Sequence, residues 1–264
     1  MKDPNNKELR SVLGNRYGEA FFADTGGNLG RELDASGILV LPYFLSADAL
    51  TTLKQEADSL KKEAYRSESS YNLFVMPEDK NFSADSARNR TFVTSKGCIA
   101  DEQVPKDSIL RKIYDADVFR KFICKLQGIE AIFPYGDTLS SINVNYYDPG
   151  DSLEWHFDNA DFAVTLLLKN CDKGGVYEYS PNVRYTATGE EDYETLTNIL
   201  DGRKETQKAS MEEGSLMIFR GNRSLHRVTK IEAGKRVLVT LNYNVKPGIP
   251  LSEKSRMTFF GRID

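Results

Sequence analysis

Hydrophobic and polar positions change their pattern at about residue 139, and this change divides the chain into two parts. Beyond it, short runs rich in Val, Ile, Tyr, Phe and Thr are separated by Gly, Pro, Asn and Asp, which is typical of an antiparallel β core. The runs predict strands near residues 141–147, 153–157, 162–168, 175–180, 215–219, 224–230 and 236–244. Polar and apolar residues alternate over 141–145 and 240–244, so both strands are expected to turn one face toward a cavity.

The first part, residues 1–138, is predicted to be a helical layer that packs on this core. Ala and Leu residues at helical spacing follow Ser46, a good N-cap residue, and predict a helix over about residues 47–66. Residues 1–35 are expected to be loop and short irregular structure. The remaining expected elements are helices at 106–114 and 115–126 and strands at 37–45, 72–76 and 91–95.

Residues 183–213 interrupt the β pattern with a charged stretch, in which 193–200 is expected to be a short helix. Such an insertion is either a solvated excursion or an active-site lid. Residues 247–264 are expected to be loop that packs back through Met257, Phe259 and Phe260. We therefore predict one domain over residues 1–264, α+β in class and mainly β, with its core at 139–246.

Composition narrows the classes of function. The net charge of −4 over 264 residues does not suggest a nucleic-acid partner or an anionic membrane surface. The N-terminus is polar, and no apolar run approaches the roughly 20 residues that span a membrane. Three widely spaced cysteines, outside any CxxC motif, argue against a disulfide framework and fit a reducing cytoplasm, where we expect the protein to act.

The candidate chemistry centres on the two histidines of the chain, His156 and His226. Alternate side chains of a strand share a face, so His156 and Asp158 can both point inward while Phe157 points away. Two imidazoles and a carboxylate on one side of a metal form the facial triad of non-haem Fe(II) oxygenases, although the same residue types also bind tetrahedral zinc. His156, Asp158 and His226 are therefore the predicted metal ligands.

The three coordination positions that such a triad leaves open suit O2 and a bidentate 2-oxo acid. 2-Oxoglutarate also has a distal carboxylate, and an arginine can bind it with two parallel hydrogen bonds. Arg236 follows His226 by ten residues and opens the last predicted strand, so it is the candidate. Taken singly, a histidine in a strand is more often a core group and Arg236 could be a turn residue. It is the combination of these residues that favours the iron site.

These residues carry a resemblance to a known family. Two segments, Tyr147-Asp148-Pro149-Gly150 with His156-Phe157-Asp158, and Leu225-His226-Arg227-Val228 with Gly234-Lys235-Arg236, resemble the prolyl-hydroxylase-like branch of the Fe(II)/2-oxoglutarate dioxygenases. The resemblance covers residues 139–245 well and 37–45 loosely. It implies a double-stranded β-helix (jelly-roll) core, the three metal ligands above, and Arg236 on the C5 carboxylate of 2-oxoglutarate. It also implies Tyr147 near that cosubstrate.

Residues 155–167 further resemble small enzymes that act on free amino acids, including the radical halogenases of free lysine and their hydroxylase relatives. In those halogenases a small residue replaces the carboxylate ligand and leaves room for chloride. Asp158 is present here, so the resemblance implies hydroxylation. The expected reaction converts free L-lysine, at C4 as a first guess, to hydroxylysine, with succinate and CO2 as the other products.

A free amino acid needs polar or charged partners for its carboxylate and its ammonium groups. Arg90 is the first candidate for the carboxylate and Asp161 for an ammonium, with Asp137 and Asn242 as further candidates. Most charged residues simply face solvent, so each alone is more often structural.

Three other readings remain open: a peptidyl prolyl or lysyl hydroxylase, a radical halogenase, and a barrel that binds a ligand without catalysis. A peptidyl hydroxylase would need an open groove, whereas an insertion at 183–213 suggests closure over a small substrate. Asp158 opposes a halogenase. The sequence does not set the oligomeric state.

Overall fold

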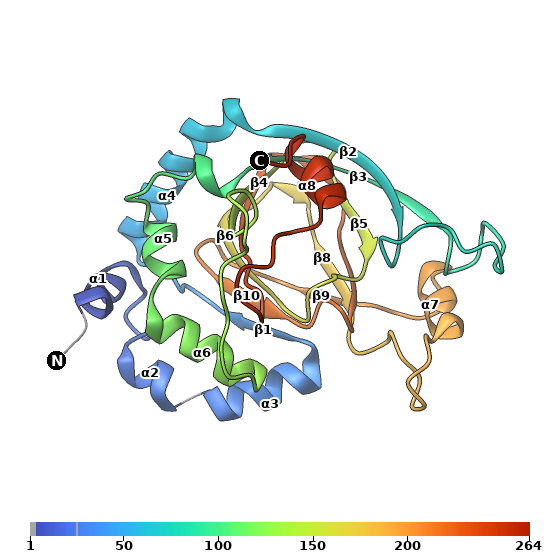
Figure 1. Cartoon of the computed structure of the whole chain (residues 1–264), viewed down its shortest axis with the longest axis horizontal. Coiled ribbons are helices and arrows are strands. Elements are labelled where there is room, and N and C mark those ends of the chain that lie inside the picture. The colour runs from blue at the N-terminus through green and yellow to red at the C-terminus, as the bar shows by residue number, and fades with distance from the viewer. Residues whose placement is uncertain (1–3, 25) are drawn as a thin grey trace.

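The computed structural model describes residues 4–24 and 26–264, and antiparallel sheets form its centre (Figure 1). The larger sheet has the strand order β1 (Ile38–Leu41), β10 (Leu216–Phe219), β6 (Ala163–Lys169), β13 (Arg236–Leu241), β4 (Ile142–Tyr147), β3 (Thr91–Ile99) and β2 (Tyr65–Asn72). The second sheet has the order β5 (Leu153–His156), β11 (Leu225–Val228), β8 (Tyr177–Ser180) and β9 (Gln207–Ala209). A small pair joins β12 (Ile231–Ala233) to β7 (Lys173–Gly174). The predicted antiparallel, sheet-rich core is confirmed.

Most helices lie on one side of the larger sheet, as the blue and green segments of Figure 1 show. They are α1 (Pro4–Val12), α2 (Glu19–Asp24), α3 (Gly26–Ser36), α4 (Ala47–Leu60), α5 (Ile109–Tyr114) and α6 (Asp117–Gln127), with 3₁₀ turns η1 (Lys61–Glu63) and η2 (Asp101–Gln103). The Ser46 side chain caps α4 by accepting a hydrogen bond from the Ala49 amide, and α6 ends at Gly128, whose φ is 68°. Apolar side chains from these helices and from one face of the sheet form the main core.

The N-terminal expectation was wrong, because α1, α2 and α3 replace the predicted loop of residues 1–35. Glycines concealed α3 in the sequence, yet Gly30 allows close packing. A Cβ there would lie 3.3 Å from the Leu126 carbonyl oxygen of α6. Leu33 is fully buried beside it, so tertiary packing stabilises a helix that propensity alone disfavours.

The expectations for residues 47–76 also need correction. The helix ends at Leu60, and β2 begins at Tyr65 and pairs with β3. The strand expected at 72–76 is instead a turn, in which the Asn72 side-chain oxygen accepts hydrogen bonds from the amides of Phe74 and Met76. Such local side-chain bonding competes with strand pairing.

The C-terminal expectation was partly wrong, because residues 247–264 contain a helix, α8 (Glu253–Phe260). Phe260 is buried, whereas Met257 is 50% exposed and does not pack back as expected. Helix α8 contacts β2 and β3, and Figure 1 shows it at the end of the sheets that faces the viewer.

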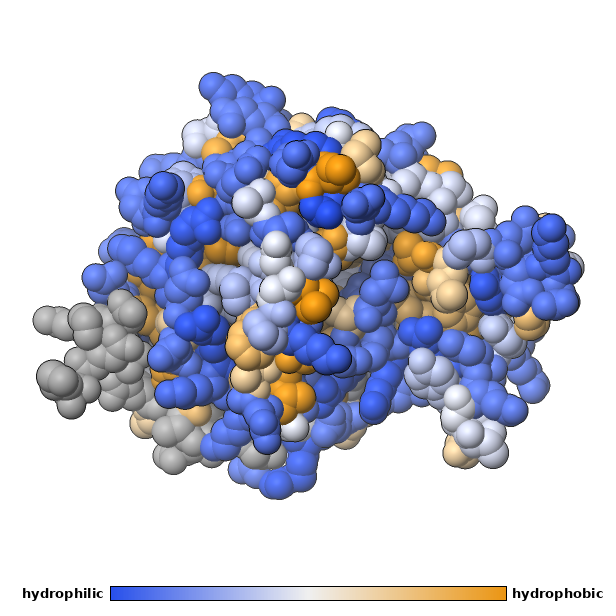
Figure 2. Space-filling model, in the orientation of Figure 1, coloured by the Kyte–Doolittle hydropathy of each residue, from blue (hydrophilic) through white to orange (hydrophobic). Residues whose placement is uncertain are grey.

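The insertion at 183–213 contains α7 (Tyr193–Leu200) as predicted, and it also supplies β9. Figure 1 shows α7 at the side of the molecule, away from α8. Leu196 and Ile199 pack there against Trp155 and Phe157. The surface seen in Figure 2 is mostly hydrophilic, with small separate hydrophobic patches. Among the described residues, no helix is both long and apolar enough to cross a bilayer.

Candidate metal centre

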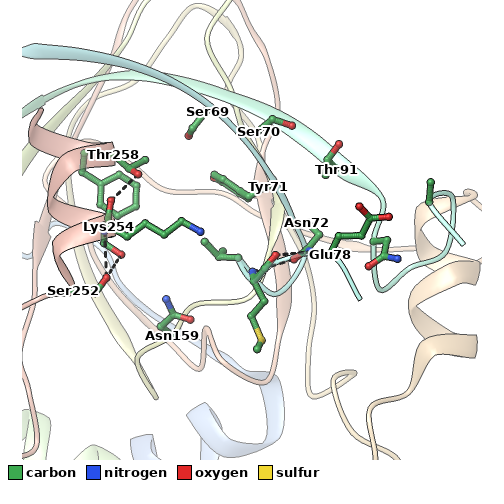
Figure 3. A pocket seen from close by; sticks show the side chains of 16 residues that line it. Ser69, Ser70, Tyr71, Asn72, Glu78, Thr91, Asn159, Ser252, Lys254 and Thr258 are labelled. Atoms are coloured by element: carbon green, nitrogen blue, oxygen red, sulfur yellow. Dashed lines mark hydrogen bonds between the residues drawn. The ribbon is translucent and has the colours of Figure 1, made fainter. Parts of the chain in front are cut away.

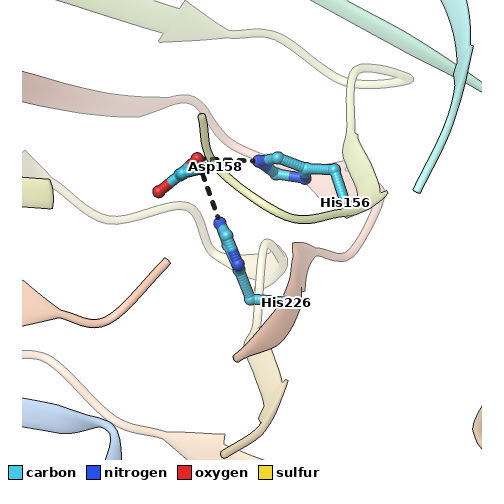
Figure 4. A group of neighbouring side chains, drawn as sticks. All are labelled: His156, Asp158 and His226. Carbon is cyan, nitrogen blue, oxygen red and sulfur yellow. Dashed lines mark ion pairs between the residues drawn. The ribbon is translucent and has the colours of Figure 1, made fainter. Parts of the chain in front are cut away.

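The second sheet brings the two histidines together. His226 on β11 pairs in register with His156 at the end of β5, and their ring centroids are 4.2 Å apart. Asp158 follows two residues after His156, and its Oδ1 lies 3.5 Å from His156 Nε2 and 3.6 Å from His226 Nε2 (Figure 4). Phe157 points away and is buried among apolar residues, as strand alternation predicts. One candidate ligand atom from each residue lies within 4.8 Å of the others.

Backbone carbonyls orient both imidazoles. His156 Nδ1 donates to the Glu154 carbonyl at 2.6 Å, and His226 Nδ1 donates to the Ser224 carbonyl at 2.9 Å. A hydrogen on Nδ1 leaves the lone pair of a neutral ring on Nε2. Both Nε2 atoms therefore face the carboxylate as potential metal donors, and such carbonyl contacts are the usual support of metal-binding histidines.

Asp158 is held as a carboxylate. Burial alone would raise its pKa, but the neighbouring imidazoles outweigh that effect and hold the pKa well below its usual range. Burial lowers the pKa of His156, which favours the neutral ring. Among the described side chains, the Asp158 Oδ2 atom is buried without a hydrogen-bond partner. Two imidazole nitrogens and one carboxylate oxygen therefore converge, and this arrangement fits a divalent cation.

Gly221 makes room for this carboxylate. The Asp158 amide donates to the Gly221 carbonyl at 3.0 Å, which places the two backbones side by side. A Cβ on residue 221 would lie 1.9 Å from Asp158 Oδ2 and 2.5 Å from Cγ, so no larger residue fits without displacing Asp158. No pattern in the sequence indicates this role of Gly221, because the role depends on contact between distant segments.

An inner cavity of about 260 Å³ lies between the triad and the larger sheet. Inward-facing residues of three neighbouring strands line it: Thr94, Lys96 and Cys98 on β3, Asn143, Asn145 and Tyr147 on β4, and Arg236, Leu238 and Thr240 on β13. The alternation predicted for β4 and for β13 thus does face a cavity. Residues 183–213 supply none of the lining residues, whereas Ser255, Phe259 and Phe260 of α8 do.

Arg236 lies at one end of this cavity, opposite Tyr147 in the register of β13 and β4. Both are buried, and burial raises the pKa of Tyr147, so its phenol stays protonated. Arg236 makes one long hydrogen bond, 3.4 Å from Nη1 to the Asn170 side-chain oxygen, and its buried Nε has no acceptor among the described residues. No carboxylate in the described part of the chain pairs with it. The guanidinium is therefore placed to receive an anion.

A second, outer pocket of about 560 Å³ adjoins the inner cavity. It lies between β2, residues 72–91 and α8, and Figure 3 shows Lys254 extending into it from α8. Six residues line both spaces: Ser69, Tyr71, Val75, Asn159, Ser255 and Phe259. The outer pocket therefore leads toward the triad, and its labelled side chains are mainly hydroxyls and amides.

Of the four substrate candidates, only Asn242 lines the inner cavity, and its amide donates to the Ser140 carbonyl at 2.7 Å. Arg90 instead pairs with Asp201 at 2.8 Å and lies outside both pockets. Asp137 accepts hydrogen bonds from the amides of Leu139, Ser140 and Leu251, which is a structural role. Asp161 accepts a hydrogen bond from Asn222 and lines a third pocket, but not the inner cavity.

Sequence reasoning missed Lys96, the only lysine among the residues that line the inner cavity. The predicted strand ended at residue 95, whereas β3 continues to Ile99. The sequence did contain a sign of this role. Residues 94, 96 and 98 are two apart along a strand, so Lys96 shares the face of Thr94 and Cys98.

Comparisons with known proteins identify relatives of this fold. The family model HalD, described as Halogenase D, matches residues 23–254. A comparison with curated proteins finds no match. Similar solved structures include an oxidoreductase of the 2OG-Fe(II) oxygenase family from Burkholderia pseudomallei, which is 15% identical with a TM-score of 0.53, over 89% of this chain and 94% of that one.

A prolyl-4-hydroxylase from Pseudomonas putida is 14% identical with a TM-score of 0.51, over 81% of this chain and 96% of its own. EctD from S. alaskensis is 19% identical with a TM-score of 0.55, over 84% of this chain and 78% of its own. At such identities these structures show a shared fold.

Proposed function

The chain belongs to the Halogenase D family, and on that premise we propose that it is an Fe(II)- and 2-oxoglutarate-dependent oxygenase that hydroxylates a small molecule. The observation that carries the proposal is the convergence of His156, Asp158 and His226 at one wall of a cavity that Arg236 also lines. Arg236 forms no salt bridge with a carboxylate of the described residues. The facing antiparallel sheets support the finer proposal of a double-stranded β-helix, within one catalytic domain over residues 1–264.

The three side chains fit iron. His156 and His226 would bind it through Nε2 and Asp158 through Oδ1, since both Nδ1 atoms are engaged with backbone carbonyls. When bound, Fe(II) with 2-oxoglutarate and O2 supplies the oxidising power to insert oxygen into a C–H bond, and the cosubstrate leaves as succinate and CO2. The chain itself orients the reactants and excludes water.

Arg236 would bind the distal carboxylate of 2-oxoglutarate, because it is a buried guanidinium without an acidic partner among the described residues. The neighbouring Tyr147 has a protonated phenol that can donate a hydrogen bond to the same anion. Met217, Phe219 and Leu238 provide apolar walls that keep water from the cosubstrate.

The family description favours a second candidate, a radical halogenase. Asp158 argues for hydroxylation, because its carboxylate takes the third ligand position that a halide would otherwise need. The carboxylate is also well accommodated, since Gly221 leaves space for Oδ2. We therefore place hydroxylation first.

The finer substrate proposal is free L-lysine, hydroxylated at C4, and the resemblance of residues 155–167 supports it. Asp158 is the only carboxylate residue among those that line the inner cavity, so the lysine side chain would have to find its acidic partner in the outer pocket, where Glu78 lies. The size of that pocket favours an alternative, a peptidyl prolyl or lysyl hydroxylase.

Mass spectrometry tests the proposal. The protein is incubated with Fe(II), 2-oxoglutarate, O2 and a panel of free amino acids and prolyl or lysyl peptides, with and without chloride. We expect a gain of one oxygen on a free amino acid, with lysine first. A chlorinated product would mean that the protein is a halogenase. Modification of peptides alone would overturn the proposal that the substrate is a free amino acid.

A further inference from the structure

Two cations line the inner cavity, Lys96 and Arg236, and neither pairs with a carboxylate of the described residues. Given the proposed function, the cosubstrate brings one distal carboxylate, which Arg236 would bind. The second cation is then left without a counterion. We propose that Lys96 binds the carboxylate of the primary substrate, which is therefore a free amino acid or another small carboxylic acid.

The contacts of Lys96 leave it able to bind an anion. Its Nζ donates to the Asn145 side-chain oxygen at 2.7 Å and lies 5.1 Å from the centroid of the Phe259 ring. An ammonium group has three donors, and the Asn145 contact uses one. Burial raises the pKa of the nearby Cys98 thiol to about 11, so that thiol is neutral and is no counterion.

Desolvation in the cavity lowers the pKa of Lys96, because an ammonium group is less well solvated there than in water. Asp158 acts in the opposite direction, but in the proposed enzyme its charge is used by the metal. A buried charge is costly unless it is paired. A bound carboxylate would give the Lys96 ammonium the counterion that the described residues do not provide.

The substrate carboxylate bound by Lys96 would lie apart from the distal carboxylate of 2-oxoglutarate bound by Arg236. Arg236 lies opposite Tyr147 on β4, whereas Lys96 bonds to Asn145, the preceding inward residue of the same strand. Two such positions are about 7 Å apart along a strand. Phe259, which covers Lys96, belongs to α8 and also lines the outer pocket. The Lys96 subsite therefore lies on the side from which substrate enters.

This subsite distinguishes the two substrate classes. A free amino acid has a free carboxylate, whereas in a residue within a peptide the same carbon belongs to an uncharged amide bond. The structure thus favours a free acid over a peptide interior.

Amino acid and amide pairs test this assignment. L-lysine is compared with L-lysinamide, which replaces the carboxylate by a neutral amide, and any other acid that gains oxygen is compared with its own amide. A charge-assisted hydrogen bond should give the wild type a preference for the acid in kcat/KM on the order of 30-fold. Lys96→Gln should reduce this ratio to near 1, and Lys96→Arg should restore much of it.

Two further readouts make the test specific. The KM for 2-oxoglutarate should stay within about twofold in Lys96→Gln if Arg236 binds that cosubstrate. Lys208→Gln is the matched control, since Lys208 is an exposed lysine on β9 that lines neither pocket. It should keep the wild-type preference.

The assignment fails if Lys96→Gln keeps the acid preference, whatever happens to its KM for 2-oxoglutarate. A failure of the proposed function looks different, because the wild type would then consume no 2-oxoglutarate. In that case calorimetric titration of the metal-free wild type and Lys96→Gln with the same acid and amide decides the role of Lys96. Equal binding of acid and amide by the wild type would overturn it, and a preference lost in the variant would support it.

Discussion

Replacing Gly221 by alanine should disable the metal centre from a position that contributes no ligand. The new Cβ would lie 1.9 Å from Asp158 Oδ2, whereas ordinary contact begins at 3.4 Å, so the carboxylate oxygen must move by about 1.5 Å. The backbones cannot easily separate, because the Asp158 amide is bonded to the Gly221 carbonyl. Metal sites tolerate ligand displacements of only about 0.2 Å.

We therefore expect Gly221→Ala to weaken Fe(II) binding at least as much as loss of a supporting residue, on the order of 100-fold. Anaerobic titration with Fe(II) measures the affinity, and circular dichroism verifies folding. Gly18→Ala is the control, because its new Cβ would meet nothing closer than Arg10 Nε at 3.6 Å. It should bind iron as the wild type does.

A double-mutant cycle isolates the cause. Asp158→Gly removes the carboxylate, so adding Gly221→Ala to that variant should cost almost no further affinity. Additive losses in the double variant would mean that Gly221 acts by some other route. Wild-type iron affinity in Gly221→Ala alone would refute the steric reasoning altogether.

Two further predictions concern charge. Arg236→Met should raise the KM for 2-oxoglutarate by on the order of 100-fold, since a charged hydrogen-bonding partner is lost. An unchanged KM would mean that Arg236 does not bind 2-oxoglutarate. Asp151→Asn should cost about 2 kcal/mol of unfolding free energy at pH 7, because Asp151 is buried and accepts bonds from Arg66, Ser95 and the Asp148 amide. Burial opposes these bonds, yet they hold the pKa of Asp151 below its usual value, so its contribution is present above about pH 4 and is lost as pH falls through the folded-state pKa. In urea unfolding the difference between variant and wild type should therefore shrink at low pH; a constant difference would contradict the assignment.

The sequence predicted the parts of the fold and site that depend on local alternation. His156 and Asp158 face one way because they are two residues apart on an extended chain, and the Thr240 end of β13 lines the cavity for the same reason. The prediction of His226 as the third ligand required a further assumption, namely that a distant β segment would pair beside the strand of His156. The register of β11 and β5 satisfies it.

Long-range contacts explain the failures. Arg90 was a reasonable partner for a substrate carboxylate, but Asp201 of the insertion pairs with it, and sequence spacing contains no sign of this. Strand β2 was missed because it lies at the edge of its sheet and its residues 65–71 are only partly buried or exposed, so no apolar run marks it. Gly221 acquires its role only when its segment packs against the segment that carries Asp158.

The central claim is that this chain binds Fe(II) and 2-oxoglutarate together at the triad. Its most direct test is anaerobic addition of Fe(II) and then 2-oxoglutarate to the metal-free protein, followed by absorption spectroscopy. We predict binding of one Fe(II) per chain and a weak visible charge-transfer band that requires both additions and is lost in Gly221→Ala at the same Fe(II) concentration. Tight binding of zinc with no visible band from Fe(II) and 2-oxoglutarate would contradict the account.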